Sequence, residues 1–249
     1  MEKAVQDVVQ PFSELRVGVQ SNGEVKLASA PWRPELSKID VWYSSYGSNM
    51  CEERFLCYIQ GGQVEGMKKP CPGSMDKSQP KGMLWKTVPH RLFFGRDSTR
   101  TWGPGGAAFL HPISNSQEKA YMCMYRITLE QFNDVLLQEN GTNYEITSPA
   151  FGLSDLDYVC KNGEVCVDMF KSQWYSNVVY MGDEDAVPIL TMTCPRSDVE
   201  NFASGKLPLR PPAKAYENIL VRGLVEGRQL SEEEARAYIK EASTRPIVI

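Results

Sequence analysis

Apolar positions along the chain form two kinds of pattern, and the first kind predicts strands. From 41 to 46 the residues are β-branched or aromatic, which favours a strand. From 120 to 127 the large apolar side chains alternate between two faces, which predicts a core strand. Further short apolar runs predict strands at 90–94, 107–110, 144–146, 165–169, 177–181 and 188–193.

The second kind of pattern repeats at helical spacing and predicts helices. One is expected at 50–59, directly after a turn-forming Gly-Ser-Asn sequence. A capping-box pattern at 128–131 opens another, which is expected to end near 139–141. The last two are expected at 216–224 and, after a second capping box, from 231 onward.

These patterns divide the chain into an extension and one domain. Residues 1–40 are expected to be peripheral, with a short hairpin around 22–23, and residues 41–249 to form a single domain. Within it, 60–88 reads as a long insertion rich in glycine and proline. Loops of this length are usually functional lids or mobile segments.

Composition excludes several kinds of chemistry. The 249 residues carry a net charge of −4, which argues against a nucleic-acid-binding face. The two histidines, His90 and His111, are too few for a three-histidine metal site, and their places in the sequence are those of ordinary loop or strand-end residues. The glycine-rich segment 101–106 fits neither GxGxxG nor a P-loop, and no GxSxG occurs. Carboxylates and backbone amides are the expected chemical groups.

The cysteine pattern and the lack of a recognisable signal peptide or membrane span predict a cytoplasmic location, or a cytoplasmic and nuclear one. The seven cysteines are odd in number and have no C-x-x-C spacing, which favours buried, reduced thiols. The first residues lack the apolar core of a signal peptide, and no run is long enough to span a membrane. No membrane partner is therefore expected.

The sequence Tyr46-Gly47-Ser48-Asn49 is the first candidate for binding chemistry. A glycine between strand and helix allows a sharp turn, and the next N–H groups would then lie at a helix N-terminus, where anions bind. Ser48 and Asn49 could bind a ligand or cap the helix. An ordinary strand-to-helix turn with an N-cap is the alternative interpretation.

Glu139 is the second candidate. It lies at the expected end of a helix, near the negative pole of the helix dipole, and Leu136 and Leu137 could desolvate it. Both effects raise a carboxyl pKa, as a general base requires. The alternative is a solvated glutamate in a turn.

The order of these motifs resembles the γ-glutamylcyclotransferase-like family. The matching features are a strand ending in YGSN, the segment RLFFGRDSTRTWGPGGAAFL, a capped helix ending at a glutamate, and a C-terminal helix with Tyr216, Ile219 and Gly223. The resemblance covers about 41–60, 88–146 and 178–240. It implies an α+β fold, a small mixed β-barrel flanked by helices, and marks 147–175 as surplus beside the 60–88 insertion.

The resemblance also implies a site. Tyr46, Gly47, Ser48 and Asn49 would bind the substrate, with Met50 where the family has leucine and Tyr144 as a pocket residue. Glu139 would be the catalytic residue. Asn140 stands where the family pattern has glycine directly after the glutamate, so Glu145 and Asp134 are fallback candidates. No metal or other cofactor is expected.

The implied activity is the release of 5-oxoproline and an amine or amino acid from a small γ-glutamyl amide, by attack of the substrate's own α-amine. Two alternatives stay open: a non-catalytic binding or regulatory protein on the same fold, and cyclising cleavage of a larger γ-glutamylated metabolite or γ-glutamyl-lysine. The sequence leaves the leaving group and the oligomeric state undecided.

Overall fold

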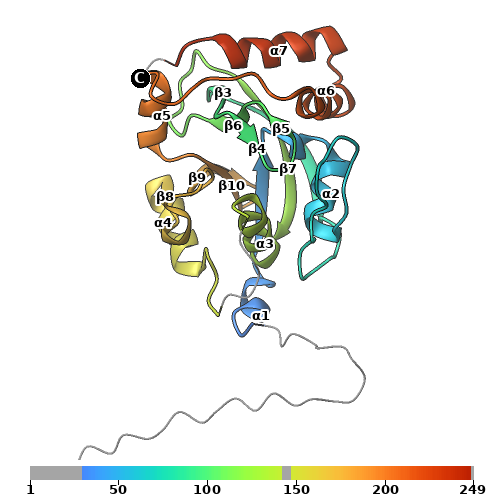
Figure 1. Cartoon of the computed structure of the whole chain (residues 1–249). Helices are drawn as coiled ribbons and strands as arrows, with labels where there is room; N and C mark the ends of the chain where they lie inside the picture. Colours follow the sequence, from blue (N-terminus) through green and yellow to red (C-terminus); the bar gives the residue numbers. More distant parts are fainter. Residues whose placement is uncertain (1–29, 142–146, 248–249) are drawn as a thin grey trace, which may run out of the picture.

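A computed structural model describes residues 30–141 and 147–247 (Figure 1). This part of the chain contains both strands and helices. The strands are β1 Asp40–Ser45, β2 Gly82–Val88, β3 Leu92–Gly95, β4 Ser98–Thr99, β5 Gly103–Pro104, β6 Ala107–Leu110, β7 Ala120–Thr128, β8 Glu164–Cys166, β9 Asn177–Glu184 and β10 Val187–Thr193. The helices are α1 Arg33–Leu36, α2 Glu52–Gln60, α3 Leu129–Glu139, α4 Leu153–Asn162, α5 Arg196–Ala203, α6 Lys214–Arg228 and α7 Glu232–Thr244, with 3₁₀ turns η1 Ser48–Met50 and η2 Asp168–Phe170.

Six of the strands form one mixed sheet in the order β2-β7-β1-β10-β9-β8, while β3 pairs with β6 and β4 with β5. The central strand β1 runs antiparallel to β7, with Tyr43 opposite Tyr125, and parallel to β10, with Trp42 opposite Ile189. Because helices and strands cover β1 on both faces, five of its six residues are buried, as its nearly continuous apolar sequence predicts.

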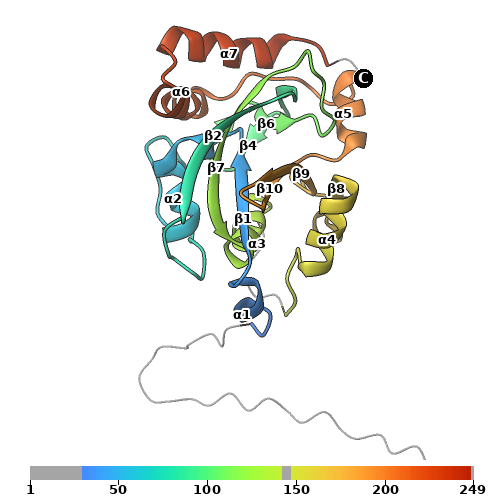
Figure 2. The same cartoon turned by 180° about the vertical axis from the view of Figure 1, so that it is seen from behind.

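Helices α2 and α3 pack on the same part of the sheet. The Phe55 ring of α2 stacks on Tyr125 of β7 at 3.9 Å and on Tyr43 of β1 at 5.4 Å, and Phe132 of α3 contacts Tyr43. Helices α6 and α7 lie together across one end of the sheet, next to β3 and β6, and α4 lies beside β8 (Figure 2). This packing places η1, the turn between β1 and α2, against α6.

The α+β class, a mixed sheet flanked by helices, is confirmed, while closure of the strands into a barrel stays a prediction. The capping box at 128–131 and the one at 231–234 both form. Several boundaries were wrong. The insertion expected at 60–88 contains the strand β2 at its end. The helices α4 and α5 were not predicted. Where one strand was expected at 165–169, the chain forms the short strand β8 and then the 3₁₀ turn η2. The expected hairpin at 22–23 and strand at 144–146 lie outside the described residues.

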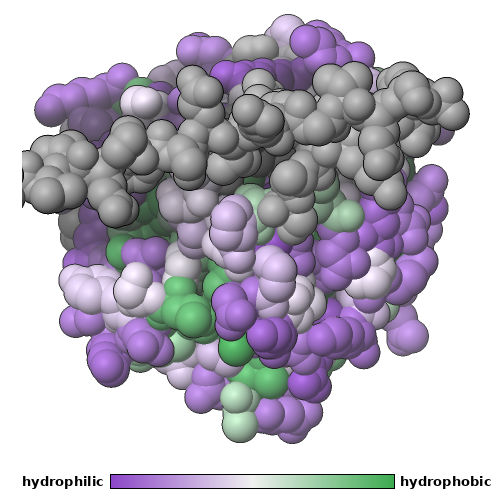
Figure 3. All heavy atoms as spheres, turned by 90° about the horizontal axis from the view of Figure 1, so that it is seen from below, coloured by the Kyte–Doolittle hydropathy of each residue, from purple (hydrophilic) through white to green (hydrophobic). Residues whose placement is uncertain are grey.

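One face of the described surface is mainly polar. Viewed from below, hydrophilic side chains predominate and apolar ones form small separate groups (Figure 3). Within residues 30–141 and 147–247, no helix combines the length and the apolar composition needed to cross a membrane. The seven cysteines form no disulfide, and Cys166 is exposed, unlike the buried thiols that the sequence favours.

Candidate functional site

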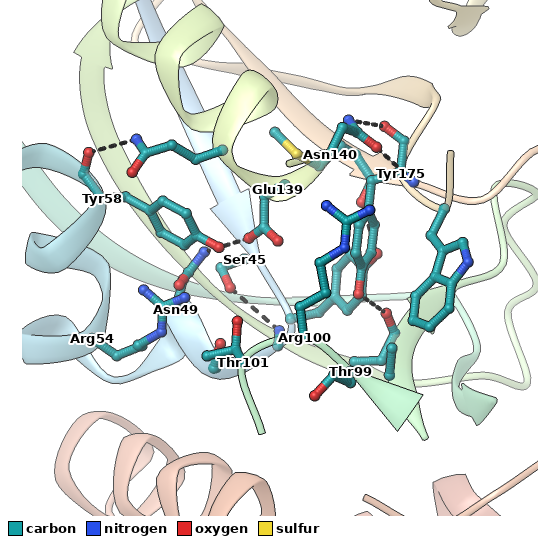
Figure 4. Close-up of a pocket in the computed structure, with 18 of the residues that line it drawn as sticks. Ser45, Asn49, Arg54, Tyr58, Thr99, Arg100, Thr101, Glu139, Asn140 and Tyr175 are labelled. Carbon is teal, nitrogen blue, oxygen red and sulfur yellow. Dashed lines mark hydrogen bonds between the residues drawn. The ribbon is translucent and has the colours of Figure 1, made fainter. Parts of the chain in front are cut away.

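A cavity of about 330 Å³ opens where elements distant in sequence meet. Its walls come from the end of β1 with η1, from α2, from the last turn of α3, from the β4–β5 hairpin, from residues 173–175 and from α6 (Figure 4). The YGSN segment and Glu139, which the sequence analysis selected separately, both line it.

The YGSN turn places backbone N–H donors on the cavity wall. Gly47 has φ −110°, so its requirement for glycine is spatial, since a Cβ there would lie 3.1 Å from the Tyr216 hydroxyl. The backbone of Ser48 lies within hydrogen-bonding reach of the same hydroxyl. Among the described residues, the Asn49 N–H has no acceptor. These donors belong to the 3₁₀ turn η1, because α2 begins only at Glu52, so the expected helix N-terminus is not what presents them.

Asn49 is fixed beside the carboxylate. Its Nδ2 donates to the Tyr43 hydroxyl at 2.9 Å and to Glu139 Oε1 at 3.1 Å, while its carbonyl accepts from the Tyr125 hydroxyl at 2.8 Å. Its own Oδ1 is buried and has no hydrogen-bond partner in the described part of the chain. Asn49 therefore links the turn to Glu139 directly, which a simple N-cap would not do.

Glu139 ends α3 with its carboxylate directed into the cavity (Figure 4). The side chain is half-buried and accepts hydrogen bonds from Asn49 and from the Tyr58 hydroxyl. Burial raises the pKa of the Glu139 carboxyl, and the charge of Arg54 and these hydrogen bonds offset only part of the effect. The direction is the one expected from the sequence, and a solvated turn position does not describe it.

Two arginines in the cavity were not foreseen. Arg54 of α2 is 2% exposed, and its guanidinium lies 4.2 Å from the Tyr58 ring centre and 3.4 Å from Cys71 Sγ. Its Nε has no hydrogen-bond partner, and it forms no ion pair within the described residues. Arg100, from the β4–β5 hairpin, lines the cavity on the other side of Glu139 (Figure 4). The one sequence signal was a basic residue, Arg54, within an otherwise apolar helix face.

Aromatic side chains close the rest of the cavity. Tyr216 of α6, matched by the family resemblance but not selected as a site residue, stacks on Trp102 at 5.6 Å. The Tyr46 hydroxyl donates to Met192 O at 2.7 Å, so Tyr46 lines the cavity with its hydroxyl already occupied. The Tyr175 hydroxyl donates to Ala108 O at 2.9 Å. These bonds hold the wall in one conformation.

The other predicted residues lie elsewhere. Met50 is buried in the core rather than on the cavity wall, and Tyr144 and Glu145 fall outside the described residues. Asp134 is fully buried away from the cavity, in an ion pair with Arg33. Asn140, the residue that departs from the family pattern, leaves Glu139 facing the cavity.

The histidines take no part in the cavity wall. The Nδ1 of His90 lies 2.9 Å from His111 O, and the Nδ1 of His111 accepts from Ile113 N. Among the residues with described positions, no cluster of three or more His, Cys, Asp or Glu side chains could hold a metal ion. From the described residues, the groups that line the cavity are one carboxylate, two guanidiniums, phenols, aliphatic hydroxyls, side-chain amides and backbone amides.

Comparison with known proteins gives partial similarities. No family model matches the chain. A curated protein of Arabidopsis thaliana, histone deacetylase 5, is 58% identical over 226 residues, which cover 91% of this chain and 34% of that protein. The chain thus spans about a third of the length of the curated relative that it matches, and the activity of the longer protein is not transferred to it.

Two solved structures are similar at a lower level. One is the uncharacterized human protein loc79017, with a TM-score of 0.44, and the other is a gamma-glutamyl cyclotransferase, with a TM-score of 0.40. Each shares 14% sequence identity and covers 84% of this chain and 90% of its own. At these TM-scores the similarity carries no functional weight.

Proposed function

We propose that the cavity is the active site of a cyclotransferase that releases 5-oxoproline and an amine or amino acid from a γ-glutamyl amide. The observation that carries the proposal is the 3.1 Å hydrogen bond between Asn49 Nδ2 and Glu139 Oε1. It links the one carboxylate among the described residues of the cavity wall to the YGSN turn.

Glu139 is suited to the proton transfers. The substrate's α-amine, freed of a proton by the Glu139 carboxylate, attacks its own γ-carbonyl carbon, forming the C–N bond of the five-membered ring. The C–N bond to the leaving amine then breaks as Glu139 returns the proton to that nitrogen, and the ring nitrogen gives its remaining extra proton to the departing amine, which leaves as an ammonium. Because nucleophile and carbonyl belong to one molecule, the reaction avoids most of the entropic cost of bringing them together.

Backbone and guanidinium groups complete the site. The Asn49 N–H group can stabilise the developing oxyanion, as preorganised amides do in acyl transfer. The buried guanidinium of Arg54 supplies a positive charge for the α-carboxylate of the substrate. Each charged group of a γ-glutamyl unit then has a partner, with the α-ammonium at Glu139.

The test is direct. The protein is incubated with a panel of γ-glutamyl amino acids, γ-glutamyl amines and γ-glutamyl-lysine, and 5-oxoproline is measured. Glu139→Gln should lower turnover by about 10²–10⁴-fold, the range for loss of a general acid–base. Glu200→Gln, at an exposed position of α5 outside the cavity, is the matched control and should not change it.

Two results would contradict the proposal. Absence of turnover across the panel, with binding of a γ-glutamyl compound still detectable by calorimetry, would favour the non-catalytic binding protein. Normal turnover by Glu139→Gln would remove Glu139 from the mechanism. Turnover of γ-glutamyl-lysine alone would favour the larger-substrate alternative.

A further inference from the structure

Tyr43 is a buried phenol of the cavity wall that takes no part in the proton transfers proposed above. It lies on β1, and its hydroxyl accepts a hydrogen bond from Asn49 Nδ2 at 2.9 Å. The same Nδ2 donates to Glu139 Oε1 at 3.1 Å. One side-chain amide therefore connects this phenol to the carboxylate.

Aromatic packing holds the phenol in place. The Tyr43 ring stacks on Phe55 of α2 at 5.4 Å, and Phe55 stacks on Tyr125 at 3.9 Å. Tyr43 and Tyr125 lie opposite each other on the neighbouring strands β1 and β7, and the Tyr125 hydroxyl donates to Asn49 O at 2.8 Å. Two facing tyrosines, with one phenylalanine against both rings, thus hold Asn49 by its side chain and by its backbone.

A second contact joins Tyr43 to the YGSN turn. Ser45 lies two residues further along β1, therefore on the same face of the strand, and it is within hydrogen-bonding reach of the Tyr43 hydroxyl. Ser45 Oγ accepts from Gly47 N at 3.3 Å. The Tyr43 hydroxyl is thus the group that contacts both Ser45 and Asn49, and it links the start of the turn to the residue that reaches the carboxylate.

The orientation of the Asn49 amide matters because only one of its two ends can donate to a carboxylate. Nδ2 donates to Glu139, whereas Oδ1 is an acceptor and would be repelled there. The Tyr43 hydroxyl stabilises the orientation in which Nδ2 faces both acceptors. Without that hydroxyl, a single hydrogen bond would orient the amide, and the donor would lie against the carboxylate for less of the time.

We propose that Tyr43 is a positioning residue: by accepting from Asn49 Nδ2, it holds the amide donor against the Glu139 carboxylate. The kinetic part of this inference rests on the cyclotransferase proposed above. The part that concerns the amide and the carboxylate does not depend on it.

The pKa of Glu139 reports on this positioning. Burial raises the pKa of the Glu139 carboxyl, and the hydrogen bond from Asn49 lowers it. The other charged or titratable groups of the described cavity wall are Tyr46, Arg54, Tyr58, Arg100, Tyr175 and Tyr216. Among the described residues, none of these accepts from Asn49 Nδ2, so Tyr43→Phe should change the contribution of the amide and leave theirs in place.

The test uses the full chain and two measurements. Carboxyl ¹³C NMR between pH 4 and 8 gives the pKa of Glu139, whose signal is the one missing from Glu139→Gln. Tyr43→Phe keeps the ring stack with Phe55 and removes the acceptor, so this pKa should rise, by up to about one pH unit, the worth of one neutral hydrogen bond. With the γ-glutamyl panel, kcat should fall about 2- to 10-fold, while KM stays within about twofold because Arg54 is unchanged.

Two comparisons show whether Tyr43 acts through Asn49. In an Asn49→Ala background, Tyr43→Phe should no longer change the pKa of Glu139, since the contact that couples them is gone. Tyr238→Phe is the matched control, because the Tyr238 hydroxyl also accepts from an N–H group, that of Tyr121 at 3.1 Å, and lies outside the cavity. It should leave the pKa of Glu139 and kcat unchanged.

The outcomes separate this inference from the proposed function. An unchanged pKa of Glu139 in Tyr43→Phe, or an equal rise in the Asn49→Ala background, would overturn the role of Tyr43 and leave the cyclotransferase standing. If the wild type turns over no γ-glutamyl compound, the cyclotransferase fails, and the NMR titration still decides on Tyr43. If Tyr43→Phe does not fold, Asn49→Ala alone is titrated: a raised pKa of Glu139 would support the link, and an unchanged one would overturn it.

Discussion

The two ends of α3 each bring a carboxylate close to a buried arginine, and the two arrangements differ in one respect. Near the N-terminal end, Arg33 donates to Glu130 at 3.0 Å and to both oxygens of Asp134 at 2.8 and 3.0 Å. At the C-terminal end, the positive charge of Arg54 acts to lower the pKa of Glu139, yet the two groups form no ion pair. We call the first cluster closed, because its carboxylates are paired with the arginine, and the second open, because Glu139 and Arg54 are not paired.

The difference separates a structural use of charge from a chemical one. Asp134 has its oxygens occupied by Arg33 and by the N–H of Met75 at 2.8 Å, so no substrate proton can reach it. Its pairing also fixes the segment before β1 on α3, since Trp32 and Leu36 are buried beside it. Glu139 is held by neutral donors and faces a cavity. Of the two carboxylates, the fallback candidate Asp134 is thus the structural one.

Replacing Arg33 or Arg54 should give the largest difference in stability between the closed and the open cluster. Arg33→Met leaves two buried carboxylates without their cation, so it should lower the free energy of unfolding by about 3–5 kcal/mol. Arg54→Met strands no paired carboxylate, so its cost should stay near about 1 kcal/mol, the worth of the lost contact with Tyr58. Urea unfolding at pH 7 measures both. Equal losses would contradict the distinction between closed and open clusters.

The open end needs an anchor of its own, and Asn140 supplies it. Its Nδ2 donates to Tyr175 O at 3.1 Å, and its Oδ1 accepts from Tyr175 N at 3.3 Å. Asn140→Ala would leave both backbone groups unpaired, which should cost about 1–3 kcal/mol. Turnover should fall as well, because Tyr175 forms the cavity wall.

Urea unfolding and kcat/KM, measured on the same Asn140→Ala protein, separate positioning from binding. Asn140→Asp, which keeps the acceptor, should recover part of the stability. A loss of turnover with unchanged stability would instead indicate that Asn140 contacts the substrate.

Local sequence signals explain why Glu139 and the YGSN turn could be predicted from the sequence. The capping box fixes where α3 begins, and the asparagine and glycine after Glu139 fix where it ends, so the position of Glu139 on its helix follows from adjacent residues. The YGSN turn is equally local. What joins Asn49 to Glu139, 90 residues apart, is the packing of α2 and α3 on one sheet.

The features that were missed depend on tertiary contacts. Arg54 and Arg100 become cavity residues because α2 and the β4–β5 hairpin approach α3 from opposite sides, and no spacing rule encodes that approach. The edge strand β2 was read as insertion because both of its faces are half-exposed, which weakens the alternation that predicts a strand. Tyr216 comes from a helix near the other end of the chain.

The third prediction concerns the stability of the open cluster. The pKa of Glu139 is raised in the folded state, so its stabilising contribution is complete at low pH and is lost as the pH rises through that folded pKa. Glu139→Gln should therefore be more stable than the wild type at pH 7, by less than the losses above, and the difference should vanish in acid. Thermal unfolding between pH 4 and 8 measures it; a destabilised Glu139→Gln at pH 7 would mean that the carboxylate is paired after all.

The smallest expected effect lies in the hydrogen bond from Tyr58 to Glu139. Tyr58→Phe removes a donor to the carboxylate, and because that donor lowers the pKa of Glu139, the pKa should rise further. The acid limb of kcat/KM should then move to higher pH, while the plateau falls by less than about tenfold, since one hydrogen bond is lost and the base stays in place. Tyr158→Phe, exposed on α4, should leave the limb unmoved. If the acid limb moves to lower pH, or persists in Glu139→Gln, a group other than Glu139 titrates in it. Glu139 would then not be the base of the proposed reaction.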